Sequence, residues 1–101
     1  MAMCDCGAPA REWIDAMGGR HVAPCDPCTI RATVARADFS HVTTRSWCGV
    51  DVLYLYCQDD RSPTRVKLEA SVHDTPENRV ALAAAGARAV PGPTRGVHAR
   101  L

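Results

Sequence analysis

Four cysteines within the first 28 residues stand in two short-range pairs, Cys4 with Cys6 and Cys25 with Cys28. Each pair can present two thiolates from one tight turn, and four thiolates suit the tetrahedral coordination that Zn²⁺ prefers. A metal bound in this way closes the loop between the pairs, so its binding free energy contributes to folding. The sequence therefore predicts one structural zinc ion per chain, with Cys4, Cys6, Cys25 and Cys28 as its ligands.

Other interpretations of these cysteines remain open. His21 lies close enough in the sequence to replace one thiolate as a ligand. The two-residue spacing of Cys25 and Cys28 also occurs in thiol oxidoreductases, although no strand–helix–strand pattern surrounds this pair. A disulfide framework is less favoured, because a bridge between Cys4 and Cys6 would be strained.

Cys48 and Cys57 need a separate interpretation. Residues 50–56 have the strongest strand pattern in the sequence, and Cys48 and Cys57 flank this strand. An extended chain would separate the two cysteines by roughly 30 Å. A disulfide between them is then excluded. We expect both to be buried as small apolar side chains, with a role as additional metal ligands as the alternative.

The segment between the two cysteine pairs must bring them together. Residues 11–15 alternate in polarity, Gly18-Gly19 is a turn signal, and residues 21–23 can return antiparallel. This pattern predicts a β-hairpin that returns Cys25 to the side of Cys6. A short helix over residues 10–17 is the alternative, because Trp13, Ile14 and Met17 would share one helical face.

A helix is favoured directly after the second pair. Asp26 is expected to cap it and Pro27 to occupy its first position, while Ile30, Val34 and Ala37 share one face. The alternation of residues 30, 32 and 34 leaves a strand as the alternative. A helix N-terminus beside the metal would also help to stabilise thiolates.

The rest of the chain predicts a small α+β fold. Residues 39–47, 50–56 and 65–72 are strand-like and suggest an antiparallel meander, with Val66, Leu68, Ala70 and Val72 on one face. Thr75-Pro76-Glu77 has the composition of a helix start, and Gly86 that of its end. The predicted organisation is a zinc-finger module (1–37), a meander with one C-terminal helix (38–90), and an extended tail (91–101).

The motif Cys4-Asp5-Cys6-Gly7-Ala8-Pro9-Ala10, followed by a hairpin and then Pro24-Cys25-Asp26-Pro27-Cys28, resembles the small zinc-ribbon and treble-clef fingers. Short proteins of this kind are common in actinobacteria and their phages. The resemblance covers the N-terminal third of the chain and implies that the four matching cysteines are zinc ligands. Treble-clef fingers serve protein binding, nucleic-acid binding and scaffolding alike, so the resemblance narrows structure more than function.

Composition limits the classes of partner. The formal net charge is only +1, which argues against a strongly electrostatic nucleic-acid binder. Trp13, Trp47, Tyr54 and Tyr56 could stack on bases, but we expect them mainly to supply bulk to the core. No apolar run is long enough to span a membrane, and six cysteines without a secretory signal favour a reducing cytoplasm, that of the host for a phage protein.

No catalytic constellation can be identified. The sequence contains no Ser–His–Asp grouping, glycine-rich phosphate loop or paired acid motif, so we expect the protein not to be an enzyme. The leading hypothesis is a zinc-binding interaction or regulatory protein, with phage encoding as one version of it, a protein partner, and at most weak nucleic-acid binding. The alternatives are a nucleic-acid-binding zinc finger, a structural component of a virion, and a thiol-redox or zinc enzyme.

Overall fold

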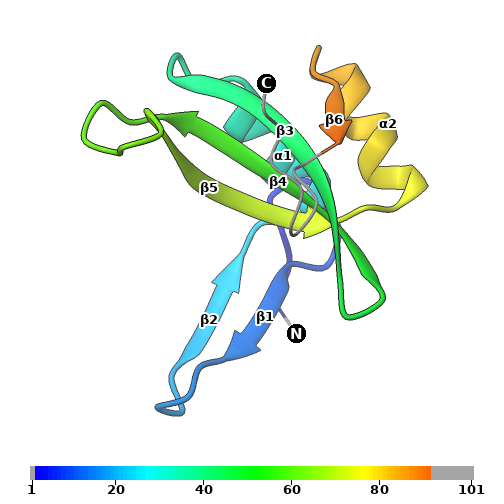
Figure 1. Ribbon diagram of the computed structural model, residues 1–101. Coiled ribbons are helices and arrows are strands. Elements are labelled where there is room, and N and C mark those ends of the chain that lie inside the picture. The colour runs from blue at the N-terminus through cyan, green and yellow to red at the C-terminus, as the bar shows by residue number, and fades with distance from the viewer. Residues whose placement is uncertain (1, 92–101) are drawn as a thin grey trace.

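The computed structural model of the chain describes residues 2–91 and has a small α+β fold with two sheets and two helices (Figure 1). In chain order the elements are β1 (Arg11–Ile14), β2 (Arg20–Ala23), α1 (Asp26–Val34), β3 (Phe39–Trp47), β4 (Val50–Gln58), β5 (Val66–His73), α2 (Pro76–Ala84) and β6 (Ala89–Pro91). The cysteine-rich segment, the hairpin β1–β2 and α1 form one end of the molecule.

The segment between the cysteine pairs is a β-hairpin, so the alternative of a short helix is wrong. β1 and β2 are antiparallel, with Trp13 opposite His21. The connecting turn is organised by Asp15, whose carboxylate accepts hydrogen bonds from the backbone N–H groups of Met17 and Gly19 at 2.9 and 2.8 Å. An aspartate that bonds to the backbone ahead of it is a common way to fix a tight turn.

The second sheet has the strand order β5-β4-β3-β6. β3, β4 and β5 are antiparallel neighbours, and β6 lies parallel to β3 with Thr43 opposite Val90. β6 follows the predicted helix and was not expected from the sequence. The remainder of the predicted tail, residues 92–101, lies outside the described residues.

β5 contains a β-bulge, so the prediction that Val66, Leu68, Ala70 and Val72 lie on one face of the strand is wrong. The register shifts so that Leu55 opposes Ala70 while the next residue of β4, Tyr56, opposes Leu68. Ala70 and Val72 therefore lie on the core side of the sheet, whereas Leu68 lies on the outer side beside Tyr56. An extra residue in one strand reverses its alternation, which no period-two pattern can reveal.

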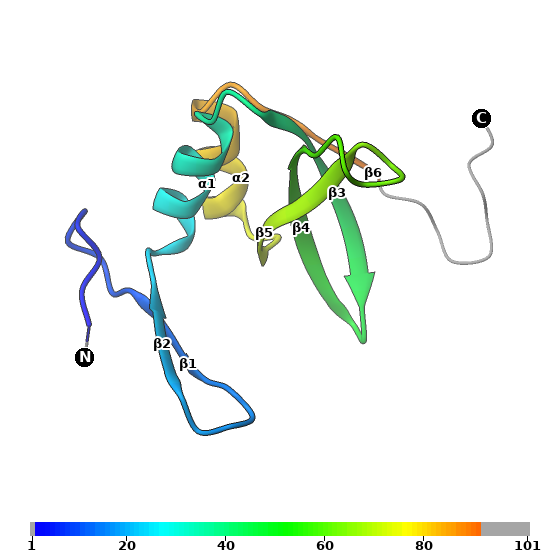
Figure 2. The same cartoon turned by 90° about the vertical axis from the view of Figure 1, so that its left-hand side faces the viewer.

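Both helices cover the same face of the larger sheet and lie side by side (Figure 2). The buried core beneath them is aliphatic and consists of Ile30, Val42, Leu53, Leu55, Val72, Ala81 and Leu82. Because Ile30 comes from α1, the helix after the cysteines shares this core with the sheet. Trp13 is half exposed and the tyrosines are half-buried, so the expectation that aromatic residues fill the core is wrong for them.

α1 begins one residue earlier than its capping pattern suggested. Cys25, not Asp26, is the N-cap residue, and Asp26 and Pro27 form the first turn. The helix ends at Val34, so Ala37 lies beyond it and does not extend the buried face that Ile30 begins. A metal-site cysteine thus sits at the N-terminal end of α1.

Candidate metal centre

The first cysteine pair is held by a short hydrogen-bonded turn. The backbone N–H of Gly7 donates to the Cys4 carbonyl at 2.9 Å, and the Cys4 N–H donates to the Ala8 carbonyl at 2.8 Å. Gly7 has φ of +93°, a left-handed conformation that costs glycine little. The turn leaves the Cys4 side chain buried and that of Cys6 exposed.

The second pair spans the start of α1. The Cys25 carbonyl accepts the Thr29 N–H at 2.9 Å, as expected at a helix N-terminus, and Cys28 lies in the first turn. Cys25 is buried and Cys28 is half-buried. The helix dipole places partial positive charge beside both sulfurs, and this charge would help to stabilise thiolates that bind a cation.

The structure brings all four predicted cysteines together. Their Sγ atoms lie within 4.8 Å of one another, and no other such group of possible metal ligands occurs in the described part of the chain. The sulfurs of Cys6 and Cys25 are 3.4 Å apart. Tetrahedral coordination at a bond length of about 2.3 Å requires sulfur–sulfur separations of about 3.8 Å. The cluster therefore has the donor atoms and the size to hold a metal ion.

The electrostatics of the cluster favour a bound cation. Backbone N–H groups of Cys6 and Cys25 donate to the Cys4 sulfur and lower the pKa of that thiol to about 6. The neighbouring sulfurs, that of Cys6 foremost, raise the pKa of Cys28 to about 12. Four sulfurs at this spacing cannot all carry negative charge at neutral pH without a cation between them.

The two helix cysteines also differ in their surroundings. For Cys25, the backbone N–H of Cys28 lowers the pKa of the thiol, but burial and the other sulfurs outweigh it and the pKa is raised. The Cys28 sulfur accepts a hydrogen bond of 3.0 Å from the guanidinium of Arg31, one turn along α1. This contact provides positive charge at the rim of the cluster.

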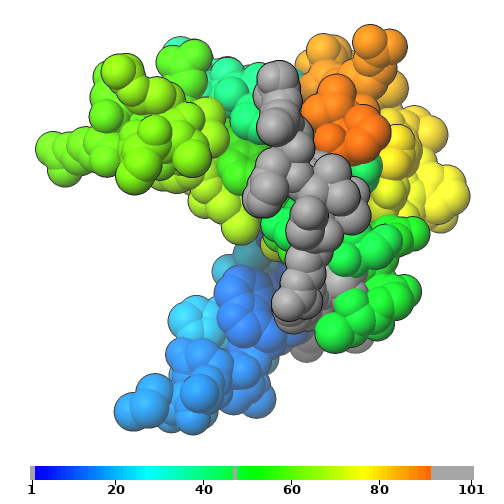
Figure 3. Space-filling model, in the orientation of Figure 1, coloured from blue at the N-terminus to red at the C-terminus, as the bar shows by residue number. Residues whose placement is uncertain are grey.

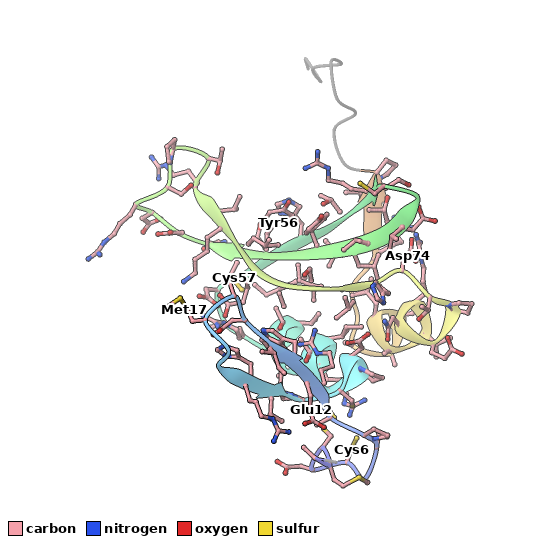
Figure 4. All side chains as sticks on the ribbon, turned by 90° about the horizontal axis from the view of Figure 1, so that it is seen from below. Cys6, Glu12, Met17, Tyr56, Cys57 and Asp74 are labelled. Carbon is pink, nitrogen blue, oxygen red and sulfur yellow. The ribbon has the colours of Figure 1, made fainter. Side chains whose placement is uncertain are left out.

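The other candidate ligands lie elsewhere. The His21 ring contacts the Asp15 carboxylate at 2.6 Å and stacks on Trp13, so it belongs to the hairpin. Cys57 is fully buried in β4, as predicted for a small apolar side chain. Cys48 is exposed in the β3–β4 turn, which corrects the expectation of burial for that residue. Tyr56 and Cys57 point to opposite sides of the sheet (Figure 4).

Sequence reasoning missed a polar network behind the cluster. Asp26, between the two helix cysteines, accepts a hydrogen bond of 3.0 Å from the buried amide of Asn78 in α2 and lies 3.4 Å from the Arg11 guanidinium. Asn78 also donates to the His73 carbonyl at 2.8 Å, and Arg11 to the Ser71 carbonyl at 3.3 Å. The network joins the first turn of α1, the hairpin, α2 and the edge strand β5.

The hairpin exposes large apolar side chains. Trp13, Ile14, Met17 and Val22 are 50–93% exposed, with Met17 at the tip most exposed. Figure 3 shows the hairpin as an arm that leaves the body, with a hollow between it and β5. This cleft has a volume of about 610 Å³ and is lined by Trp13 on the arm, Ala32 on α1 and Ser71 on β5. Because neighbouring strand residues point to opposite faces, Ile14 and Val22 lie on one face of the hairpin and Trp13 on the other, and exposed apolar groups of this kind are candidates for contact with a partner.

Three arginines, Arg11, Arg20 and Arg31, lie on the hairpin and on α1, and each contacts other groups of the chain. Arg11 donates to the backbone as described, Arg20 forms a 2.6 Å ion pair with Glu12, and Arg31 donates to Cys28. Their intramolecular contacts reduce the positive charge available for phosphate groups.

Comparison with known proteins found no matching family model, no similar curated protein and no similar solved structure. Neither helix of the described chain is long and apolar enough to cross a membrane.

Proposed function

We propose that the protein is a small zinc-binding interaction protein. Cys4, Cys6, Cys25 and Cys28 hold one structural Zn²⁺, and the hairpin docks on a protein partner. The observation that carries this proposal is the convergence of the four Sγ atoms within 4.8 Å of one another. An ion bound to these sulfurs would cross-link the N-terminal turn to α1. Four protein ligands would leave it no open position for a reactant.

Zinc is favoured by the chemistry of the donors. An all-sulfur, four-ligand set suits Zn²⁺ or an iron–sulfur centre, whereas Mg²⁺ and Ca²⁺ prefer oxygen. Two cysteine pairs on tight turns, one of them at a helix N-terminus, are typical of structural zinc sites. The order of turn, hairpin and helix is the pattern on which the resemblance to treble-clef fingers rests.

A protein partner is favoured by the surface of the hairpin. Its apolar side chains are exposed, while its charged groups are paired within the hairpin, Glu12 with Arg20 and Asp15 with His21. An anionic partner such as nucleic acid would need free positive charge, whereas an apolar protein surface would bury the exposed side chains. This contrast ranks a protein partner above nucleic acid.

Native mass spectrometry of protein purified without a chelator tests the metal half of the proposal. We expect the mass of the chain plus one zinc, with all six cysteines reduced. Protein that is folded but carries no metal would refute it.

Affinity purification from the native host tests the partner half, with wild-type protein and an Ile14→Ser/Met17→Ser variant as matched baits. Both side chains are exposed, so the variant should unfold at the same temperature as wild type. A specific partner should be captured by wild type and lost with the variant. Equal capture by both baits would remove the hairpin from the proposed function.

A further inference from the structure

We propose that Cys6 is the oxidation-sensitive ligand of the cluster: a peroxide oxidises its sulfur, Cys25 closes a Cys6–Cys25 disulfide, and the site releases its metal. The inference rests on the proposed zinc site and adds a redox response to it. It concerns these two sulfurs specifically, because the four ligands differ in access and in hydrogen bonding.

Access distinguishes Cys6 first. Cys4 and Cys25 are buried, with 8% and 6% of their surface exposed, and Cys28 is half-buried. Cys6 is exposed and lies on the N-terminal loop at the outer end of the molecule (Figure 4). Oxidation of cysteine follows exposure and thiolate character, so a soluble oxidant meets Cys6 before the other three ligands.

Hydrogen bonding distinguishes it further. The Cys28 sulfur accepts a hydrogen bond of 3.0 Å from the Arg31 guanidinium. A cationic donor lowers the basicity of a thiolate that it contacts, and the intrinsic nucleophilicity of a thiolate falls with its basicity. The Cys6 sulfur instead contacts another sulfur, that of Cys25, at 3.4 Å. Cys6 is therefore the most accessible of the four ligands, and its sulfur does not accept the hydrogen bond from Arg31 that the Cys28 sulfur accepts.

The same contact identifies the second sulfur. A bridge between Cys6 and Cys4 would span one intervening residue and be strained, and Cys28 is held by Arg31. A Cys6–Cys25 bridge must shorten the observed 3.4 Å to about 2.05 Å. The exposed turn that carries Cys6 can supply this movement, whereas Cys25 is fixed at the start of α1.

The chemistry balances with a peroxide as the oxidant. The Cys6 thiolate attacks one peroxide oxygen, the O–O bond breaks, and sulfenic acid and hydroxide form. The Cys25 thiolate then attacks the Cys6 sulfur, and the S–O bond breaks with loss of a second hydroxide. Two thiolates, one H₂O₂ and two protons thus give one disulfide and two waters. Cys4 and Cys28 remain, too few thiolates for a structural site.

Titration of the zinc-loaded protein with H₂O₂ tests the inference. Zinc release is followed with a colorimetric chelator, and cysteines are mapped by mass spectrometry after differential alkylation. We expect release to track the appearance of a Cys6–Cys25 disulfide. Two results with the wild-type protein would overturn the inference. One is that Cys4, Cys25 or Cys28 is oxidised before Cys6; the other is that Cys48 is oxidised while zinc is retained throughout.

A Cys6→His variant sharpens the test, because imidazole preserves a fourth ligand but cannot be oxidised to a disulfide. Its zinc release should be at least about tenfold slower than that of wild type, since the accessible sulfur is gone. Cys48→Ser, which removes an exposed cysteine outside the cluster, is the matched control and should release zinc at the wild-type rate. Equal rates for Cys6→His and wild type would contradict the inference. A wild-type protein purified without zinc would instead refute the proposed function.

Discussion

The side-chain amide of Asn78 donates a hydrogen bond of 3.0 Å to the Asp26 carboxylate, and this bond connects the first turn of α1 to α2 across 52 residues of sequence. Asn78 is 4% exposed, so its partners are shielded from water. The candidate metal centre is therefore attached to the body of the protein by a specific buried contact as well as by the packing of α1.

Replacement of Asn78 by alanine should destabilise the protein. The substitution removes the hydrogen bond to the Asp26 carboxylate and one of the two donors to the His73 carbonyl, which also accepts the Thr75 N–H, and loss of such buried bonds costs roughly 1–3 kcal/mol. Urea unfolding of the zinc-loaded protein measures this loss. Val80→Ala is the matched control, because Val80 is 69% exposed in the same helix and its replacement should leave stability nearly unchanged. Equal stability of Asn78→Ala and wild type would show that the network contributes nothing.

Replacement of Cys25 by serine separates metal binding from helix capping. Cys25 is the N-cap of α1, and serine is among the best N-cap residues, so capping alone predicts no loss. We expect the variant to lose zinc and to unfold at a markedly lower temperature, because metal affinity contributes to folding. Elemental analysis and thermal unfolding measure both effects, with Cys48→Ser as the control. A variant that stays folded and zinc-loaded but loses an activity would favour an enzyme.

Nucleic-acid binding should be weak and should disappear as salt rises. A protein that neutralises several phosphates releases condensed counterions and therefore loses affinity steeply with salt. Because Arg20 and Arg31 are engaged within the chain, little positive charge remains for such contacts. Titration of labelled duplex and single strands at two salt concentrations measures this. Tight binding at the higher salt, lost in an Arg20→Ala/Arg31→Ala variant, would reverse the order of the two partner classes.

Stability should depend on the ionisation of Asp74. Arg79 donates to its carboxylate at 2.7 Å and, despite partial burial, holds the pKa of Asp74 below its ordinary value. A carboxyl whose pKa is lower in the folded state stabilises the protein above the unfolded pKa of about 3.9, and loses that contribution as pH falls towards the folded value.

Asp74→Asn should therefore lower the unfolding temperature at pH 7, and its difference from wild type should shrink below about pH 4. Both proteins release metal in acid as thiolates are protonated, so the difference between them isolates Asp74. Asp60→Asn, in the exposed β4–β5 loop, is the control. A difference that is independent of pH would contradict the role given to the ion pair.

Local chemistry explains which parts of the structure were predictable from sequence. Paired cysteines and the Gly18-Gly19 turn are short-range signals, and they correctly placed the four sulfurs together on either side of a hairpin. The strands β3, β4 and β5 likewise follow from residue composition over short windows. These features depend on residues that are neighbours in the chain.

The unpredicted features depend on contacts between distant residues. The β5 bulge exists only relative to its partner β4, and β6 is a strand only because β3 offers it an edge. The Asp26–Asn78 bond has no signal in either local sequence, although an aspartate between two metal-site cysteines is a reasonable place to search for a supporting contact. Pairings of this kind require the three-dimensional structure.

X-ray absorption spectroscopy at the zinc edge tests the central claim most directly, because it reports both the metal and its ligands. The claim that Cys4, Cys6, Cys25 and Cys28 bind one structural zinc predicts four sulfur neighbours at about 2.3 Å, and the same spectrum for the Cys48→Ser variant. A zinc shell containing nitrogen or oxygen, or a spectrum that changes in Cys48→Ser, would contradict it.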